Sequence, residues 1–344
     1  MPLVEYKPEH FELIAETGKT AEVPALLHRA HTDYYYTTSP HAKLYFSTDD
    51  FKSVKAMIAV EKMPFLFGET SVTVGFGHHW HSLQPGAGGL LFMHWLKSCQ
   101  IPMEFGGSDE SHAFLKQSRW EYFEGMHTYL LNPRYRTHSD DSPVVKLAKW
   151  GWCKAAMRPP LHKRLDKIRS VAPKGLEVRE ERAYTEDLLP RTSPFTVRFH
   201  PDTEYLNWRY NLNLSFVKYR VFRLLLLEET IGYVILNEQH NRIVVSQCDA
   251  TDPIALAYGT LLSVVEAGKS GTQRKEIGLV SSFPAMQEVY MKFGFVTNQR
   301  LDRRFALGLQ RIKFDIPRDT TQWLLNYDWG DVVFRPPFLD EKEV

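Results

Sequence analysis

The sequence predicts an α/β protein in which one unit, a mixed sheet with helices, occurs twice. Extended segments rich in β-branched and aromatic residues alternate with segments of helical spacing in both halves of the chain. The order of these elements is similar in the two halves: antiparallel strands, a helix, a parallel strand and a short helix. A chain of 344 residues is also long for one core, which favours two domains.

The elements of the first half follow from the spacing of its apolar residues. Runs with a period near 3.6 predict helices, and runs of alternating or β-branched residues predict strands. In chain order we expect helices over 22–31 and 49–62, extended segments over 64–69 and 71–83, a helix over 88–99, a strand over 101–107 and a helix over 111–120.

The second half repeats this order after a connector with several prolines. We expect strands over 220–229, 230–239 and 242–250, a helix over 254–271, a strand over 274–282 and a short helix over 285–295. The sequence therefore predicts a first domain over 1–133, a helical linker over 134–175 and a second domain over 176–344.

The connector is basic. Between residues 132 and 175, lysine and arginine occur eleven times, against three aspartates. Apolar residues stand among these cations: Val144, Val145, Leu147, Trp150 and Trp152. Two interpretations are open, a solvated helical brace across both domains or a surface that touches an anionic lipid or polymer.

Composition and charge limit the function classes. The net charge of +1 gives no global field that favours nucleic acid or an acidic partner. The three cysteines, Cys99, Cys153 and Cys248, form no CxxC pair, which argues against a disulfide framework and a cysteine zinc site. The start of the chain carries charge where a secretory signal needs an apolar core, and no run is long enough to span a membrane. We expect a cytoplasmic protein.

The segment "GHHWHSLQPGAGG", residues 77–89, carries two competing signals. On a regular strand His79 and His81 share one face, and His78 and Trp80 share the other. Two imidazoles could begin a zinc site, but no nearby cysteine or helical histidine pair supplies further ligands, so we expect no metal. His79 or His81 could instead act as a base, or serve as satisfied structural histidines.

The glycines that follow suit an anion better than a metal. Gly86, Gly88 and Gly89 let the backbone approach diphosphate oxygens, and the next helix presents unpaired N–H groups and the positive end of its dipole. The alternative is a Pro-Gly turn that enters a tightly packed helix.

Several motifs resemble the GNAT acyltransferase superfamily. The segment "EVYMKFGFVTN" resembles the Y-x-K-x-GF signature at the end of its acetyl-coenzyme A binding core, and "LQPGAGGLLFMHWL" resembles its pyrophosphate loop. The whole chain, including "YLNWRYNLN" and the tail "TQWLLNYDWGD", is similar to tandem GNAT proteins associated with bacterial polysaccharide clusters. The resemblance implies two GNAT-like domains in tandem.

The resemblance also implies a donor and a donor site. The co-substrate would be acetyl-CoA or another acyl-CoA. The donor loop would comprise Gln84, Gly86, Ala87, Gly88 and Gly89. The Gln or Arg of the family motif falls on Leu83, with Gln84 one place late, which puts one hydrogen bond to the donor in doubt.

The resemblance assigns catalytic roles as well. Tyr290 would protonate the departing thiolate, and the acceptor would attack the thioester directly. Trp208 and Arg209 would face the acceptor, a small molecule or saccharide with an amine or hydroxyl, although such an arginine is more often an interdomain salt-bridge partner.

Each half keeps one part of this machinery and lacks the other. The first half has the glycine loop but Leu115 at the position of the tyrosine, and "DPIALAYGTLL" in the second half lacks the glycines. Two alternatives therefore remain: a binding or scaffold protein with degenerate domains, or a Fem-type aminoacyl transferase. The near-neutral charge weighs against the second alternative and against nucleic-acid partners in general.

Overall fold

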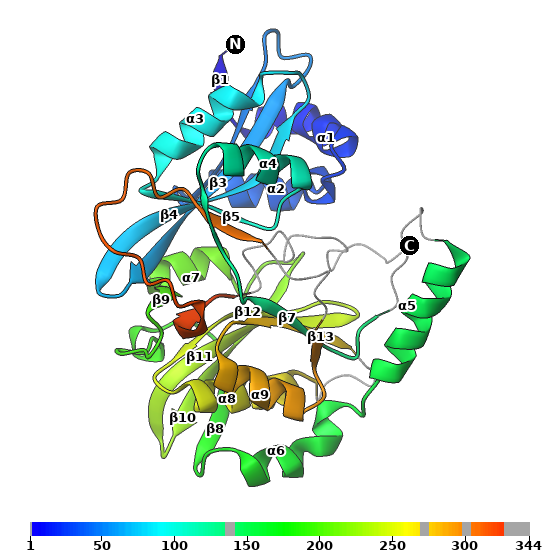
Figure 1. Ribbon diagram of the computed structural model, residues 1–344, viewed down its shortest axis with the longest axis vertical. Coiled ribbons are helices and arrows are strands. Elements are labelled where there is room, and N and C mark those ends of the chain that lie inside the picture. The colour runs from blue at the N-terminus through cyan, green and yellow to red at the C-terminus, as the bar shows by residue number, and fades with distance from the viewer. Residues whose placement is uncertain (1, 135–141, 269–274, 298–303, 327–344) are drawn as a thin grey trace.

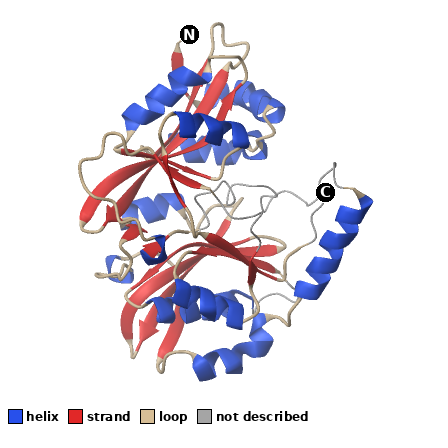
Figure 2. Ribbon diagram, in the orientation of Figure 1, coloured by secondary structure: helices blue, strands red, loops and turns tan. Residues whose placement is uncertain are grey.

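The computed structural model describes residues 2–134, 142–268, 275–297 and 304–326. Figure 1 shows two lobes, one above the other, each built around a sheet with helices packed on it, and Figure 2 shows the same lobes by secondary structure. Residues 135–141 of the predicted linker and 327–331 of the tail motif lie outside the described residues.

The upper lobe comes mainly from the first half of the chain. In order, its elements and the strand that follows them are β1 (Leu3–Glu5), α1 (Phe11–Thr20), α2 (Arg29–Thr37), β2 (Ala42–Ser47), β3 (Ala56–Phe67), β4 (Thr70–Ser82), α3 (Gly88–Ser98), β5 (Ile101–Phe105), α4 (Asp109–Gln117), β6 (Glu121–Phe123) and β7 (His127–Leu131).

The rest of the chain supplies the connector helices and the lower lobe. Its elements are α5 (Pro143–Ala156), α6 (Leu165–Val171), β8 (Leu176–Glu181), β9 (Val197–Phe199), α7 (Thr203–Arg209), β10 (Lys218–Leu226), β11 (Glu229–Glu238), β12 (Arg242–Ala250), α8 (Pro253–Gly268), β13 (Glu276–Ser281), α9 (Pro284–Lys292), β14 (Val296–Thr297), β15 (Phe305–Leu307) and β16 (Trp323–Leu324).

The two sheets exchange strands. The first sheet has the order β1-β2-β3-β4-β5-β15-β6, and β9 joins it beside β3, with β16 beside β9. The second sheet has the order β14-β7-β13-β12-β11-β10-β8. Thus β7, from the first half, lies between β13 and β14 of the second sheet, and β15, from the second half, lies between β5 and β6 of the first. Each predicted domain therefore contributes one strand to the sheet of the other, at the position next to the last strand of the order.

The two mixed sheets with helices confirm the predicted fold class. In both sheets a series of antiparallel strands is followed by one parallel pair. This pair is β4 with β5 in the first sheet and β12 with β13 in the second. The helix that crosses between these parallel strands is α3 in the first case and α8 in the second. The internal duplication inferred from the sequence is therefore visible in the topology.

Two predicted helices of the first half are wrong. The helix expected over 49–62 is a loop up to residue 55 and then the first part of strand β3, whose residues are buried on both sides of the sheet. A strand covered on both faces reads as a continuous apolar run, which periodicity cannot separate from a buried helix. The helix expected over 22–31 is a 3₁₀ turn, Pro24–Leu27, followed by α2. There the His28 side chain accepts a hydrogen bond from His31 N and caps α2.

The cores lie on both faces of the first sheet. Met57 and Ala59 join a core that contains Tyr36 of α2, whereas Ile58, between them, joins a core that contains Trp95 of α3. The core on the α2 side also includes residues of the lower lobe, such as Trp208. The two lobes thus share one continuous apolar interior. No helix in the described part of the chain is long and apolar enough to cross a membrane.

The strand exchange predicts that the halves do not fold separately. Residues 1–133 alone would keep β7 without β13 and β14, and would lack β15, β9 and β16. We expect this fragment to show no cooperative urea transition by circular dichroism, because its sheet has unpaired edges and an open core. The full chain, as the control, should unfold in one cooperative transition. A separate cooperative transition of the 1–133 fragment would contradict this expectation.

Candidate functional site

The parallel pair of the first sheet forms a fork. β4 and β5 pair over three residues, from Val74 to Phe76, opposite Ile101 to Met103. Beyond this point β4 continues to Ser82, and the two strands no longer pair in register. Beyond Phe76, the inner edge of β4 is therefore not held by the parallel register with β5.

A β-bulge lies at this fork. Ala59 of β3 stands opposite His78 of β4, and two positions earlier Met57 stands opposite His81. One residue of β3 therefore faces two residues of β4, and His79 is one of these two. His79 has φ +52°, a left-handed conformation that is uncommon for a residue with a Cβ. Such conformations concentrate at functional sites.

The bulge overturns the predicted alternation of the histidines. His79 and His81 were expected on one face, and His78 and Trp80 on the other. Instead His78 lies near Tyr36 of α2, with ring centroids 6.2 Å apart, whereas Trp80 packs against α3 on the opposite face. His79 turns toward His78, and their centroids are 4.6 Å apart. The extra residue interrupts the alternation of side chains between the two faces of the strand, so the residues after it point to the opposite face from the one expected.

The buried histidines around the bulge favour the neutral form. Burial lowers the pKa of His78 well below its usual value. Burial also lowers the pKa of His31, on α2, to about 3. A neutral imidazole is the state that can accept a proton. His81, at the end of β4, is more exposed than His78 and His79.

The glycine loop leaves the backbone open at the start of α3. Gly86 has φ +78°, and a Cβ built there or at Gly89 meets nothing within 4 Å. The loop is held in place by Ser82, whose Oγ accepts from Gly88 N at 3.2 Å, and by the Lys55 carbonyl, which accepts from two loop amides. α3 has no acidic residue in its first turn and no side-chain cap. This helix N-terminus is therefore suited to an anion.

The other predicted donor residues hold the loop rather than line its open side. Ala87 is buried, and its N–H donates to the Gln84 carbonyl at 3.2 Å. The Gln84 N–H and the Leu83 N–H both donate to the Lys55 carbonyl. The Gln84 side chain, which stands one residue after the expected Gln or Arg of the motif, is at the surface and could reach a ligand there.

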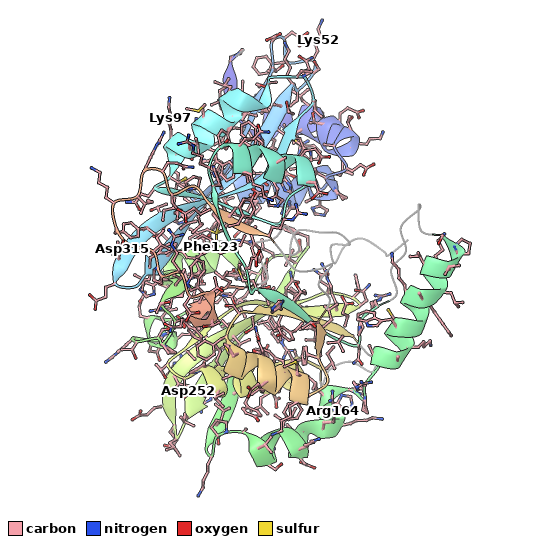
Figure 3. The ribbon with its side chains drawn as sticks, viewed as in Figure 1. Lys52, Lys97, Phe123, Arg164, Asp252 and Asp315 are labelled. Atoms are coloured by element: carbon pink, nitrogen blue, oxygen red, sulfur yellow. The ribbon has the colours of Figure 1, made fainter. Side chains whose placement is uncertain are left out.

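The second sheet has the same fork with a different helix start. β12 and β13 pair over three residues, from Arg242 to Val244, and β12 carries a bulge two residues further on. At the N-terminus of α8, however, Asp252 accepts a hydrogen bond from Ala255 N at 2.6 Å. Figure 3 labels Asp252 in the lower lobe. A carboxylate thus occupies the place that a phosphate would need.

Tyr290 lies in the lower lobe, apart from the glycine loop. It belongs to α9, is 2% exposed, and its ring packs near Tyr129 and Phe295. Burial raises the pKa of Tyr290, and a hydrogen bond with Thr260 opposes this rise. Figure 1 shows α9 and α3 in different lobes. The structure therefore does not bring the predicted acid and the predicted donor loop into one site.

Trp208 and Arg209 join the lobes. Both lie on α7, and Arg209 Nε donates to Glu61 Oε1 of β3 at 2.9 Å, with both side chains buried. The guanidinium also lies 5.0 Å from the ring centroid of Tyr35, whose hydroxyl donates to Glu61 Oε2 at 3.1 Å. The Trp208 carbonyl accepts from Tyr34 at 2.8 Å. Of the two roles that the sequence offered for Arg209, acceptor contact or an interdomain salt bridge, the structure shows the salt bridge.

Glu61 and a second polar pair also lie in the upper lobe, and no sequence motif marked them. Glu61 lies in the segment that was wrongly expected to be a helix, so the sequence did not indicate that its side chain faces α7. The second pair is His112 of α4 and Tyr122 of β6, with Nδ1 and the hydroxyl 2.9 Å apart. His112 also contacts the carbonyl of Gly106, directly after β5. Burial lowers the pKa of His112 and raises the pKa of Tyr122.

Within the described ranges, no group of three or more His, Cys, Asp or Glu could hold a metal ion.

The buried ion pair between the lobes predicts a large stability effect. Arg209→Met would leave the Glu61 carboxylate buried without its cation, so we expect the free energy of unfolding to fall by about 3–5 kcal/mol in urea titrations. Arg318→Met, which breaks an exposed pair with Glu121, is the control and should cost about 1 kcal/mol or less. Equal losses in the two variants would show that the interdomain pair contributes no more than a surface pair.

Comparison with known proteins identifies the fold. No family model matches the chain, and no curated protein matches it. Solved structures do match. A GCN5-related N-acetyltransferase from Anabaena variabilis has a TM-score of 0.55 at 10% identity, over 89% of this chain and 72% of that one.

Two further structures agree. A presumed acetyltransferase from Pyrococcus horikoshii has a TM-score of 0.52 at 10% identity, over 94% of each chain. A conserved protein of unknown function from Enterococcus faecalis, presumed to be an N-acyltransferase, has a TM-score of 0.50 at 9% identity, over 89% of this chain and 71% of that one. The fork, the bulge and the helix that follows thus belong to a chain with the fold of the GNAT N-acetyltransferases.

Proposed function

We propose that the protein is an acyltransferase that uses acetyl-CoA or another acyl-CoA, and that the donor binds in the upper lobe. The observation that carries this proposal is the difference between the two forks. Beside the upper fork, the N-terminus of α3 follows an open glycine turn and carries no carboxylate, since the neutral Ser82 hydroxyl accepts from Gly88 N; beside the lower fork, the Asp252 carboxylate caps α8. A coenzyme A diphosphate is attracted to the first and repelled by the second.

The position of the bulge supports acyl transfer at the same fork. The donor's diphosphate at Gly86 and Gly89 would place its extended arm along the inner edge of β4, where β5 no longer supplies partners. His79 and His81 lie on this part of β4. The arrangement puts candidate bases between the donor loop and the interior shared by the lobes.

The chemistry needs one base and one acid. The acceptor nitrogen or oxygen attacks the thioester carbonyl carbon, and a neutral imidazole, of His79 or His81, takes the acceptor proton. The tetrahedral intermediate then collapses, the carbon–sulfur bond breaks, and coenzyme A leaves as a thiolate, which takes up the proton that the imidazole received or a proton from water. Tyr290 remains the candidate acid only for a donor bound in the lower lobe.

The acceptor is proposed from the resemblance alone. Its class is an amine or hydroxyl of a small molecule or saccharide, in keeping with the likeness to proteins of polysaccharide clusters. A cytoplasmic location and the Fem-type alternative stay predictions. Trp208 and Arg209 would act on the acceptor indirectly, because their side chains are buried against β3 and α2.

One observation favours a second candidate, a non-catalytic scaffold. Trp80 at the upper fork packs against Phe92 of α3 at 5.5 Å, and Phe114 of α4 packs edge-on against the same Phe92 at 4.8 Å. These rings occupy space between α3 and α4. A fork filled in this way would hold the lobe together without admitting a donor.

A charge placed at the start of α3 tests the donor site. Gly89 has open space for a side chain, so Gly89→Asp should fold normally. Its carboxylate should weaken acetyl-CoA binding about tenfold or more in calorimetric titrations, because it repels the diphosphate. The control Gly89→Ala adds the Cβ without the charge and should bind within about threefold of the parent.

Gly89 is a better site for this test than Gly88. A Cβ at Gly88 would lie 3.2 Å from Ser82 Cβ, so a bulky residue there could disturb the loop itself. If the Asp and Ala variants at Gly89 bind acetyl-CoA equally well, the donor does not bind at this helix. If the parent protein binds no acyl-CoA, the scaffold is favoured.

A pair of variants tests which lobe carries the chemistry. Asparagine tolerates the left-handed conformation of residue 79, so His79→Asn keeps the bulge but removes the imidazole. We expect the turnover rate to fall about 10²-fold or more, with donor affinity unchanged. Tyr290→Phe keeps the buried ring and should turn over within a few-fold of the parent. The opposite pattern would move the active site to the lower lobe.

A further inference from the structure

Helix α5 of the connector exposes its large apolar side chains. Val144 is 77% exposed, Leu147 66% and Trp150 49%, and their spacing of three residues places them along one side of the helix. Trp152 and Val145 are exposed beside them. Both tryptophans among the exposed large hydrophobic residues of the described chain lie on this one helix.

The amphipathic character of α5 is reversed. A surface helix normally turns its apolar side to the core and its polar side to water. In α5 the buried residues are Cys153 and Ala156, and Lys146 and Lys149 are only partly exposed. The outward side carries the valine, leucine and tryptophan side chains instead. Because these apolar side chains stay in water, their burial contributes little to the stability of the helix.

The helix forms where local signals fix it. The Ser142 side chain accepts from Val145 N at 3.3 Å and caps its start, with Pro143 at the first helical position. Pro159 and Pro160 follow its end. In Figure 1, α5 lies to one side of the lower lobe, with its length running up toward the level of the upper lobe. These local signals thus define where α5 begins and ends.

The charge around this surface has one sign. From residue 142 to residue 165 there is no aspartate or glutamate. The same segment contains six cations: Lys146, Lys149, Lys154, Arg158, Lys163 and Arg164. The Lys154 ammonium lies 5.7 Å from the Trp150 ring centroid, so the cations and the aromatic surface are adjacent. The chain as a whole carries a net charge of only +1, which makes the segment a local exception.

We propose that α5 docks in the plane of an anionic lipid bilayer. Its outward side would insert at the boundary between headgroups and acyl chains, with the tryptophans at the interface, and the exposed cations Lys154 and Arg158 would pair with lipid phosphates. This requires no membrane-spanning helix. The proposal does not depend on the proposed acyltransferase activity, because α5 lies outside the fork and the glycine loop.

A second copy of the chain fits the surface less well. Two α5 helices packed face to face would bring together two segments rich in lysine and arginine that contain no acidic residue. Like charges at such an interface are unfavourable. An anionic polymer would satisfy the cations but would leave the valine and leucine side chains without an apolar environment. The bilayer satisfies both features.

The test is co-sedimentation of the full-length protein with vesicles. We expect binding to an equimolar mixture of phosphatidylcholine and phosphatidylglycerol, and little binding to phosphatidylcholine alone. Tryptophan emission should shift to shorter wavelength on binding, and binding should weaken as salt is raised past physiological strength. Failure to bind the anionic vesicles at low salt overturns the proposal.

Matched variants separate docking from general stickiness. Leu147→Ser combined with Trp150→Ser should weaken vesicle binding about tenfold or more, because two exposed apolar anchors are lost. Leu227→Ser is the control, since Leu227 is 72% exposed but lies in the turn between β10 and β11. It should bind vesicles as the parent does. All three substitutions are at exposed positions, so unchanged thermal unfolding should confirm folding.

Other outcomes would point to other partners. If the Leu147→Ser, Trp150→Ser variant binds vesicles as tightly as the parent, α5 is not the docking element. If the parent self-associates in sedimentation equilibrium and the double variant does not, the surface is an interface between copies. If heparin binds in a salt-dependent manner while anionic vesicles do not, the cations serve an anionic polymer. Each of these results overturns bilayer docking.

Discussion

The exchange of one strand between the sheets is the constraint on which the rest of this structure depends. β7 completes the second sheet between β13 and β14, and β15 completes the first between β5 and β6. A strand in the interior of a sheet satisfies backbone groups on both of its edges and covers core on both faces. Neither sheet is whole without the other half of the chain. The two lobes are therefore held as one folding unit, although their elements repeat.

The contact between the lobes is built on this frame. β9, from the second half, adds to β3 at the outer part of the first sheet, and α7 follows it and carries Arg209 against Glu61. A buried ion pair needs additional hydrogen bonds to offset the loss of water, and the hydroxyls of Tyr35 and Tyr205 provide them on Glu61. The pair fixes the position of α7 beside the strand that faces the bulge. The surroundings of β3 in the upper lobe thus include residues from both halves of the chain.

The two repeated units share the arrangement of their strands but differ at the start of the helix that crosses the fork. Both sheets open into a fork after three parallel pairs, and both carry a bulge on the strand before the crossing helix. The helix starts differ: α3 follows a glycine turn with an open backbone, whereas Asp252 caps α8. A carboxylate cap and a bound phosphate compete for the same amides. Under the proposed function, the upper lobe would hold the donor and the lower lobe would act as its structural partner.

The sequence determined the fold class, the duplication and the glycine loop, because these are local properties of spacing and backbone freedom. It could not separate the buried strand β3 from a helix, since strands covered on both faces lose their alternation. It did not reveal the bulge at His79, which depends on the register between β3 and β4. The partners of Arg209 and the exchange of β7 and β15 were decided by tertiary structure alone. These contacts join residues far apart in the chain, and no local pattern specifies which strand edge or carboxylate a distant segment will meet.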